Sequence, residues 1–217
     1  MSWNRATPIT PTTPAGAKVI ILIPHRDEHD YRQWSQWWLT KMQKPPGTLW
    51  LESRGLSLTT NRTKLIREAL KSDATHFFFL DDDVIAPDDV IPTLLAANLP
   101  IVCGLYMAKK AKGERGLSAW MKVSEKGYAA IGLEQTGRYV QVDVTALGCV
   151  LLHRSIFERV PEPWFVWDPD SISEDFFFFE KVADTLNIKP VADMECRCLH
   201  IGIFALDTNN EFDTLGV

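Results

Sequence analysis

The fold of this chain is decided by the stretch FFFLDDDVI, residues 77–85. An unbroken apolar run such as Phe77 to Leu80 is typical of a strand that is buried on both faces, as in a parallel sheet. The carboxylates of Asp81, Asp82 and Asp83 then lie where this strand leaves the core. Because ligands of open α/β sheets bind outside the carboxyl ends of the strands, the three aspartates are a candidate functional site.

Three adjacent carboxylates repel one another, and such a cluster is costly unless a cation neutralises it. Carboxylate oxygens suit hard divalent ions, so Mg2+ or Mn2+ is the expected partner. The plainer alternative is a solvated acidic turn before a helix, which is the role we expect for Asp88 and Asp89. We favour the functional interpretation for Asp81 to Asp83, because the apolar run before them anchors them to the core.

The composition fits a single domain, since 217 residues with 46% hydrophobic content can bury a substantial core. A net charge of -5 and a pI near 5.5 argue against general nucleic-acid binding. No apolar stretch is long enough to span a bilayer and the N-terminus lacks a signal-type apolar region, so we expect a cytoplasmic protein with no transmembrane segment. Residues 1–16 predict a disordered arm, which leaves 17–217 as one folded domain.

The first hundred residues alternate between strand-like and helix-like segments, which predicts an α/β fold with a parallel sheet and right-handed crossovers. The helices are expected around the tryptophans at 34, 37 and 38, over 61–71 with Thr60 as its cap, and after Pro87. The strands are expected at residues 18–23, 48–51, 77–80 and 101–105. From Leu117 to Val144, short pieces between glycine-containing turns predict an appended, smaller antiparallel portion.

A second acidic site lies at Ser173-Glu174-Asp175. Ser171 and Glu174 have the spacing of a capping box, so Glu174 has an ordinary structural explanation. Asp175 falls on the same helical stripe as Phe178 and Val182, and a carboxylate at the end of an apolar stripe is expected to point into a cleft. The alternative is that Asp175 only stabilises the positive end of the helix dipole.

His200 and the four cysteines are the remaining candidates for metal binding. A lone histidine is more often structural than a ligand, but an imidazole can complete an aspartate site for a transition-type ion such as Mn2+. The cysteines lack the paired spacing of zinc sites, and we expect them to be buried free thiols, at positions 103, 149, 196 and 198.

In this order and spacing, the segments resemble nucleotide-sugar-dependent glycosyltransferases of the GT-A fold, particularly small inverting enzymes of family 2. The resemblance covers about Lys18 to Gly202. The matching pieces are Val19 to Pro24, Leu58 to Arg62, Phe77 to Asp83 as the DxD region, Ile101 to Tyr106, Ala146 to Leu152, Trp164-Phe165, Ser173 to Asp175 and Cys198 to Gly202. The usual acidic uridine contact after the first strand is replaced by His25-Arg26-Asp27-Glu28.

The resemblance implies a Rossmann-like, mostly parallel sheet, with a nucleotide-binding part at about 17–110 and an acceptor side at about 111–217. It implies a nucleoside-diphosphate sugar as donor, with a UDP-sugar favoured and a GDP-sugar possible. The metal, Mn2+ or Mg2+, would be held by Asp83, Asp81 and His200. The nucleotide or diphosphate would contact residues Asn61, Arg62, Asp81 and Asp82.

For the acceptor, the resemblance implies that Asp175 is the general base that deprotonates a hydroxyl of a glycan or another acceptor. A single displacement would then invert the anomeric centre. Trp164, Phe165 and Trp167 could form an apolar platform for a sugar ring. Packing of these three side chains onto the sheet is an equally good interpretation.

Three other functions compete with a glycosyltransferase. A non-catalytic nucleotide-sugar or carbohydrate-binding protein would have the same acidic and aromatic surfaces, and only an activity measurement distinguishes it. A sugar nucleotidyltransferase would need a glycine-rich phosphate loop, whereas the first strand here runs into Pro24-His25-Arg26. A haloacid-dehalogenase phosphatase would place the DxD strand first in the chain, and two strands precede it here.

Overall fold

The computed structural model describes residues 16–25, 31–108, 116–125, 127–167 and 173–202, and the backbone of two paired strands, β13 (Phe204–Leu206) and β14 (Phe212–Thr214). Apart from Gly16, the arm predicted for residues 1–16 lies outside the described residues, as do Arg26, Asp27 and Glu28. Within the described part, no helix combines the length and the apolar character needed to cross a bilayer.

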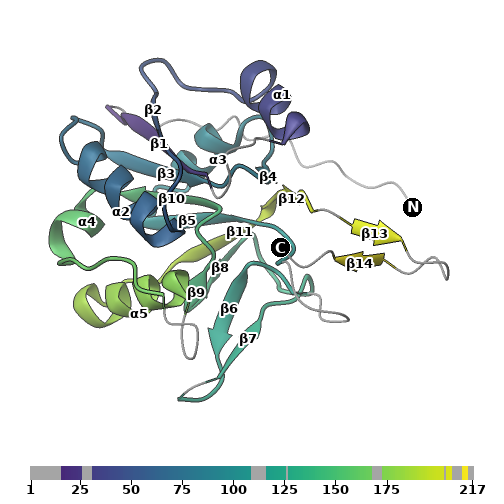
Figure 1. Ribbon diagram of the computed structural model, residues 1–217. Coiled ribbons are helices and arrows are strands. Elements are labelled where there is room, and N and C mark those ends of the chain that lie inside the picture. Colours follow the sequence, from purple (N-terminus) through teal and green to yellow (C-terminus); the bar gives the residue numbers. More distant parts are fainter. Residues whose placement is uncertain are drawn as a thin grey trace.

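One seven-stranded sheet forms the centre of the molecule (Figure 1). The predicted α/β class is confirmed, and the parallel portion comprises β1 with both of its neighbours and the β5–β11 pair. The strands lie in the order β2 (Leu49–Ser53), β1 (Val19–Pro24), β3 (His76–Leu80), β10 (Cys149–His153), β5 (Ile101–Leu105), β11 (Val191–Arg197) and β8 (Tyr139–Gln141).

The sheet is mixed, because β10 comes from the second half of the chain and lies antiparallel between β3 and β5. The other antiparallel neighbour is β8, which pairs with β11 at the edge of the sheet. The first four residues of β10 are buried, so this strand suits a central position in the sheet.

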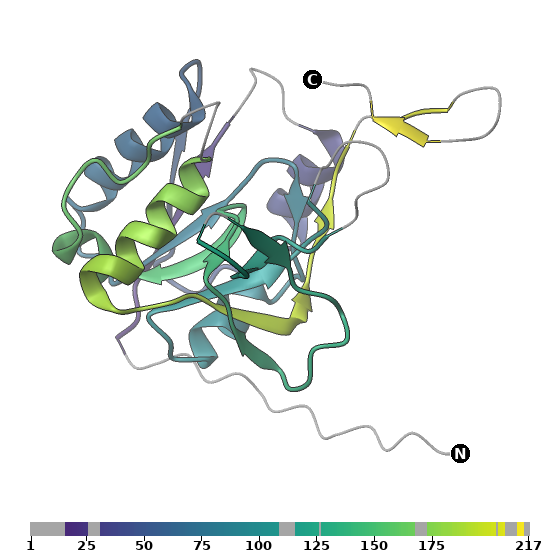
Figure 2. The ribbon, with the colours of Figure 1, turned by 90° about the horizontal axis from the view of Figure 1, so that it is seen from below.

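Alternate residues of β3 belong to two different cores, as expected for a strand that is covered on both faces. Phe77 and Phe79 pack into one hydrophobic cluster, and Phe78 and Leu80 pack into the other. The first cluster is covered by α2 (Leu58–Ala69), α4 (Ser155–Arg159) and α5 (Glu174–Leu186), which lie on the same face of the sheet (Figures 1 and 2). The second cluster is covered by α1 (Arg32–Thr40), with its three buried tryptophans, and by α3 (Val90–Ala96).

Two helix starts differ from the sequence-based expectation. The cap of α2 is Ser57, whose hydroxyl accepts a hydrogen bond from the Thr60 amide at 3.3 Å, so Thr60 lies inside the helix. The cap of α5 is Ser173, without a side-chain hydrogen bond, whereas the expected capping residue Ser171 lies outside the described residues. With Ser173 as the cap, Glu174 and Asp175 both lie in the first turn of α5.

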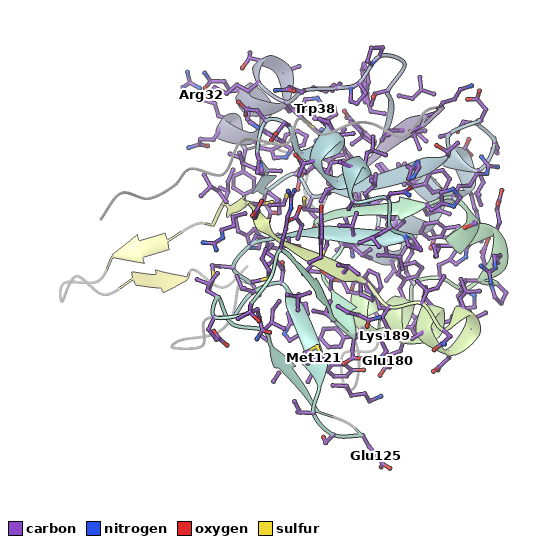
Figure 3. The ribbon with its side chains drawn as sticks, turned by 180° about the vertical axis from the view of Figure 1, so that it is seen from behind. Arg32, Trp38, Met121, Glu125, Glu180 and Lys189 are labelled. Carbon is purple, nitrogen blue, oxygen red and sulfur yellow. The ribbon has the colours of Figure 1, made fainter. Side chains whose placement is uncertain are left out.

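The antiparallel portion predicted for Leu117 to Val144 is confirmed. A three-stranded sheet is formed by β6 (Ala119–Lys122), β7 (Tyr128–Ala130) and β9 (Val144–Thr145). Glu180 of α5, labelled in Figure 3, accepts a hydrogen bond from Tyr128 and another, at 3.2 Å, from Lys122. These contacts attach α5 to the small sheet.

A short antiparallel pair joins the segment after the aspartate triplet to residues 199–200. β4 (Val84–Ile85) directly follows Asp83, and it pairs with β12 (Leu199–His200) so that His200 lies opposite Val84. The amide of Ile201 also donates to the carbonyl oxygen of Asp83 at 2.8 Å. The backbone therefore brings His200 to the aspartates.

Candidate active site

The three aspartates after β3 point to three different partners. A turn ends the strand, since the Val84 amide donates to the Asp81 carbonyl oxygen at 3.1 Å. In an extended strand the first and third aspartates would share a face, so this turn is what separates them. The partners are Arg62 for Asp81, His25 for Asp82 and His200 for Asp83.

Arg62 contacts three carboxylates from two distant parts of the chain. It lies on the buried stripe of α2 and is 1% exposed. Its guanidinium donates to Asp81 at 3.2 Å, to Glu174 at 2.6 Å and to Asp175 at 3.0 Å. The end of β3 is thus joined to the first turn of α5, where the helix dipole also stabilises acids.

Crowding and burial change the acidity of this group. Burial raises the pKa of Asp175 to about 7 against the opposing effect of Arg62, and the charges of Glu174 and Asp81 raise it further. Burial also raises the pKa of Asp81, again opposed by Arg62. A carboxyl group with a pKa near neutrality is suited to take up and release a proton during a reaction.

Tyr106, which directly follows β5, contacts the loop before β10 beside the acids. Its hydroxyl accepts a hydrogen bond from the Gly148 amide at 3.1 Å, and burial raises the pKa of Tyr106. A Cβ atom at Gly148 would lie 2.3 Å from that hydroxyl and 2.8 Å from the Asp81 carboxylate, so the site leaves no room for a side chain there. The Leu147 amide donates to Asp175, and the loop before β10 therefore holds both acids.

His200 and Asp83, which the family resemblance predicts to share a metal, lie close together. The Nε2 atom of His200 lies 3.4 Å from a carboxylate oxygen of Asp83, and its Nδ1 atom lies 2.7 Å from the carbonyl oxygen of Met107. A carbonyl oxygen only accepts hydrogen bonds, so Nδ1 of His200 donates to Met107, and Nε2 is the ring atom that faces Asp83. Either a proton on Nε2 or a bound cation fits between this atom and the carboxylate.

The chemistry of this pair fits a divalent metal ion. Two ligands at about 2.1 Å from an octahedral ion lie about 3 Å apart, close to the observed 3.4 Å separation. The hydrogen bond from Nδ1 to a backbone carbonyl is the usual way in which a ligating histidine is oriented. Asp81, which the resemblance predicts to share the metal, contacts Arg62.

Two of the side chains predicted to contact the nucleotide, Asn61 and Asp82, contact other groups of the protein. Asn61 is fully buried, and its amide donates to the carbonyl oxygens of His25 at 3.0 Å and Leu56 at 3.2 Å. Both donors of Asn61 are therefore used, and its position is that of a residue that holds β1 against α2. Asp82 lies 2.8 Å from Nδ1 of His25 and is also buried.

The aromatic side chains proposed for the acceptor divide into two groups. Trp164 and Phe165 are each 5% exposed and pack in the core against Phe157 and Phe178, which favours the packing interpretation for these two. Trp167 is 62% exposed. It lines a pocket of about 370 Å³ together with Leu56, Ser57, Leu58, Thr59 and Glu174.

Glu174 is a site residue that the sequence analysis did not assign to the site. It lines the pocket, is 9% exposed and, at 2.6 Å, lies closer to Arg62 than Asp81 or Asp175 does. The sequence of α2 could have predicted a role for Glu174, because Arg62 has the helical spacing of a buried stripe with Leu65, Ile66 and Ala69. An arginine on a buried stripe requires buried acids, and the acidic pair at 174–175 could have been assigned to it as a whole.

Comparison with known proteins adds to this geometry. No family model and no curated protein matches the chain. Among solved structures, A197 from STIV is similar with a TM-score of 0.63 and 19% identity, over 93% of this chain and 95% of that one. GalNAc-T7, in a structure with UDP, GalNAc and Mn2+, is similar with a TM-score of 0.53 and 11% identity.

The second match covers 85% of this chain and only 44% of GalNAc-T7. At these identities the comparisons define the fold. The chain has a GT-A-like α/β fold, the fold that it shares with glycosyltransferases.

Proposed function

We propose that the protein is a metal-dependent glycosyltransferase that moves a sugar from a nucleoside-diphosphate sugar to an acceptor hydroxyl, with inversion. One observation carries the proposal. At the carboxyl end of β3, a histidine–aspartate pair suited to a divalent ion lies beside a buried group of acids that contains a carboxyl with a pKa of about 7. The GT-A-like fold supports this assignment, as does the presence of UDP and Mn2+ in the GalNAc-T7 structure.

In this proposal Asp83 and His200 hold Mn2+ or Mg2+ at the end of β4 and β12. The ion would neutralise the charge that develops on the diphosphate leaving group. Asp81, which contacts Arg62, would lie near the donor sugar or the ribose. Arg62 itself acts by holding Asp81, Glu174 and Asp175 in place, since its guanidinium already serves all three.

Asp175 is the proposed general base. With a pKa of about 7 it is ionised in a large part of the molecules at neutral pH, and it binds a proton more strongly than an ordinary aspartate does. Glu174 is the competing candidate because it lines the pocket beside Trp167. This pocket is the proposed acceptor site, in which the exposed Trp167 ring packs against a sugar.

The proposal is tested in two steps. UDP-, GDP- and dTDP-sugars are first screened for binding by calorimetry with Mn2+ present, and the bound donor is then offered to glycan acceptors. Binding that is equal with Mn2+ and with EDTA would contradict the metal site, and binding without transfer to any acceptor would favour a nucleotide-sugar-binding protein.

The base is identified with a matched pair of variants, Asp175→Asn and Glu174→Gln. Loss of a general base lowers turnover on the order of 100-fold to 10,000-fold while donor binding is retained. We expect this loss for Asp175→Asn, together with loss of the rise in parental rate with pH through about 7. If Glu174→Gln shows the loss instead, the base is Glu174, and a product with retained anomeric configuration would contradict the single-displacement mechanism.

A further inference from the structure

Three of the four cysteines lie together on the face of the sheet that carries the α1 and α3 cluster. Cys149 begins β10, Cys196 lies near the end of β11, and Cys198 follows that strand. Their sulfur atoms all lie within 4.8 Å of one another. Cys149 and Cys196 are buried, whereas Cys198 is partly exposed and offers a route from solvent.

A glycine on the intervening strand makes this arrangement possible. β5 lies between β10 and β11, so Cys149 and Cys196 reach toward each other over Gly104. A Cβ atom on Gly104 would lie 2.8 Å from the sulfur of Cys196, 2.9 Å from that of Cys149 and 3.1 Å from that of Cys198. The three sulfurs therefore surround one point at nearly equal distances.

Strand spacing excludes a disulfide between Cys149 and Cys196. Neighbouring strands lie about 4.8 Å apart, so two strands separated by a third are about 10 Å apart. A disulfide needs Cα atoms within about 7 Å of each other. These two side chains can share a common partner, but they cannot bond to each other without movement of the sheet.

We propose that Cys149, Cys196 and Cys198 form a binding site for one soft, thiophilic metal ion, Zn2+ or Cu+. Such ions prefer thiolate ligands, and sulfurs at about 2.3 Å from one ion lie about 4 Å apart, within the observed limit. In the part of the chain that the structure describes, these three cysteines are the ligands of the group. Three sulfur ligands suit three-coordinate Cu+, or Zn2+ with a water molecule as the fourth ligand.

The site is separate from the proposed catalytic metal, because thiolates select soft ions and the Asp83–His200 pair suits hard or intermediate ones. Its effect would be structural. The Cys198 amide donates to the Leu105 carbonyl oxygen at 2.7 Å, and Cys198 leads directly into β12. An ion shared with Cys149 would fix the start of β12 to the centre of the sheet.

The test uses Cd2+ as a spectroscopic probe. The full chain is prepared reduced and metal-free, and Cd2+ is added while the thiolate-to-metal charge-transfer absorption is recorded. The proposal expects saturation at one equivalent and displacement of Cd2+ by Zn2+ or by Cu+, which identifies the preferred ion. Absence of the absorption at one equivalent, or displacement by neither ion, would overturn it.

The fourth cysteine, Cys103, is the control. It is also buried, but it lies in the core on the opposite face of the sheet and hydrogen-bonds with Thr145. Cys103→Ser should keep the absorption, whereas Cys149→Ser and Cys198→Ser should lower it at least tenfold at equal Cd2+. Cys198→Ser decides the matter if the buried Cys149→Ser does not fold. Equal loss in Cys103→Ser and Cys198→Ser would contradict the site.

A second readout does not depend on Cd2+. Alkylation of the thiols, followed by mass spectrometry with and without one equivalent of Zn2+ or Cu+, should show protection of Cys198 by the ion that displaces Cd2+. Unchanged modification of Cys198 with both ions would identify the three residues as neutral core thiols.

Discussion

Arg62 carries one positive charge among three carboxylates, and it is as buried as the phenylalanines of the core. An ionised acid in such a place is stable only with its partner, so the acids and the arginine depend on one another. The pKa of Asp175 is raised because burial disfavours the charged form, and because the single cation of Arg62 does not fully compensate the neighbouring acids. Single substitutions in this group should therefore have large effects on stability.

Arg62→Ala should destabilise the fold by about 3 to 5 kcal/mol, the usual cost of removing one partner of a buried ion pair. Urea unfolding at neutral pH measures this loss. The matched control is Arg67→Ala on the same helix, because Arg67 is exposed and pairs with Glu162 at the surface. We expect a much smaller loss for the control, and equal losses for the two variants would show that the buried group is not a stabilising unit.

Asp175→Asn should increase stability at alkaline pH. The pKa of Asp175 in the fold is about 7 and its ordinary value is 3.8, so the folded state binds this proton more tightly than the unfolded state. The resulting stability is fully present below the ordinary pKa and is lost as pH rises through the folded pKa. The variant lacks this loss.

The measurement is the difference in free energy of unfolding between Asp175→Asn and the parent from about pH 4 to about pH 8. We expect the difference to favour the variant increasingly as pH rises. Glu68→Gln, an exposed change on α2 next to Lys71, is the control and should leave the pH dependence unchanged. A variant that is less stable than the parent at about pH 8 would mean that the Arg62 contact outweighs the burial of the acid.

His200→Ala should weaken Mn2+ binding at least tenfold, a cost of about 1.4 kcal/mol, and Asp83→Asn should do the same. Each change removes one of the two side chains that would hold the metal. Calorimetry of Mn2+ binding to the parent and to the two variants measures the effect. The control is His153→Ala, at the end of β10. If this change weakened Mn2+ binding as much as His200→Ala does, His200 would not be a metal ligand.

At the scale of secondary-structure elements, the loop that leads into β10 is held by close contacts. Gly148→Ala would place a methyl group against the Tyr106 hydroxyl and Asp81. Overpacking of this kind costs about 1 to 3 kcal/mol and should also displace the Asp81 side chain. Urea unfolding measures the cost. An unchanged midpoint would show that the Tyr106 ring can move away.

The sequence predicts the strands well and their order only in part. β5 and the core of β3 follow from short apolar runs bounded by turn signals, and β1 ends at Pro24 as its last residue. The place of β10 does not follow, because an apolar strand fits any central position of a sheet and the choice is made by long-range packing. The predicted start of α2 was displaced because Ser57, Thr59 and Thr60 all carry a hydroxyl group that could cap a helix, and only the folded backbone selects Ser57.

The site shows the same division between local and long-range information. The meeting of His200 with Asp83 was predicted on the family resemblance, and the pairing of β4 with β12 is what accomplishes it. The roles of Asp175 and of the metal remain predictions. Glu174 was not assigned to the site because a local capping interaction explained it, while its actual partner is 112 residues away in the sequence.

For the whole molecule, the position of β10 has a consequence for how the protein is made. The strand fills the gap between β3 and β5, so β3 lacks one neighbour until residue 153 has been synthesised. β5 also pairs with β11, so its neighbours are complete only at residue 197. The first hundred residues should therefore leave the ribosome with an incomplete sheet whose exposed edges require protection from aggregation. A fragment ending near residue 110 should not fold alone, and its recovery should depend on chaperones or on later supply of the missing half as a separate chain.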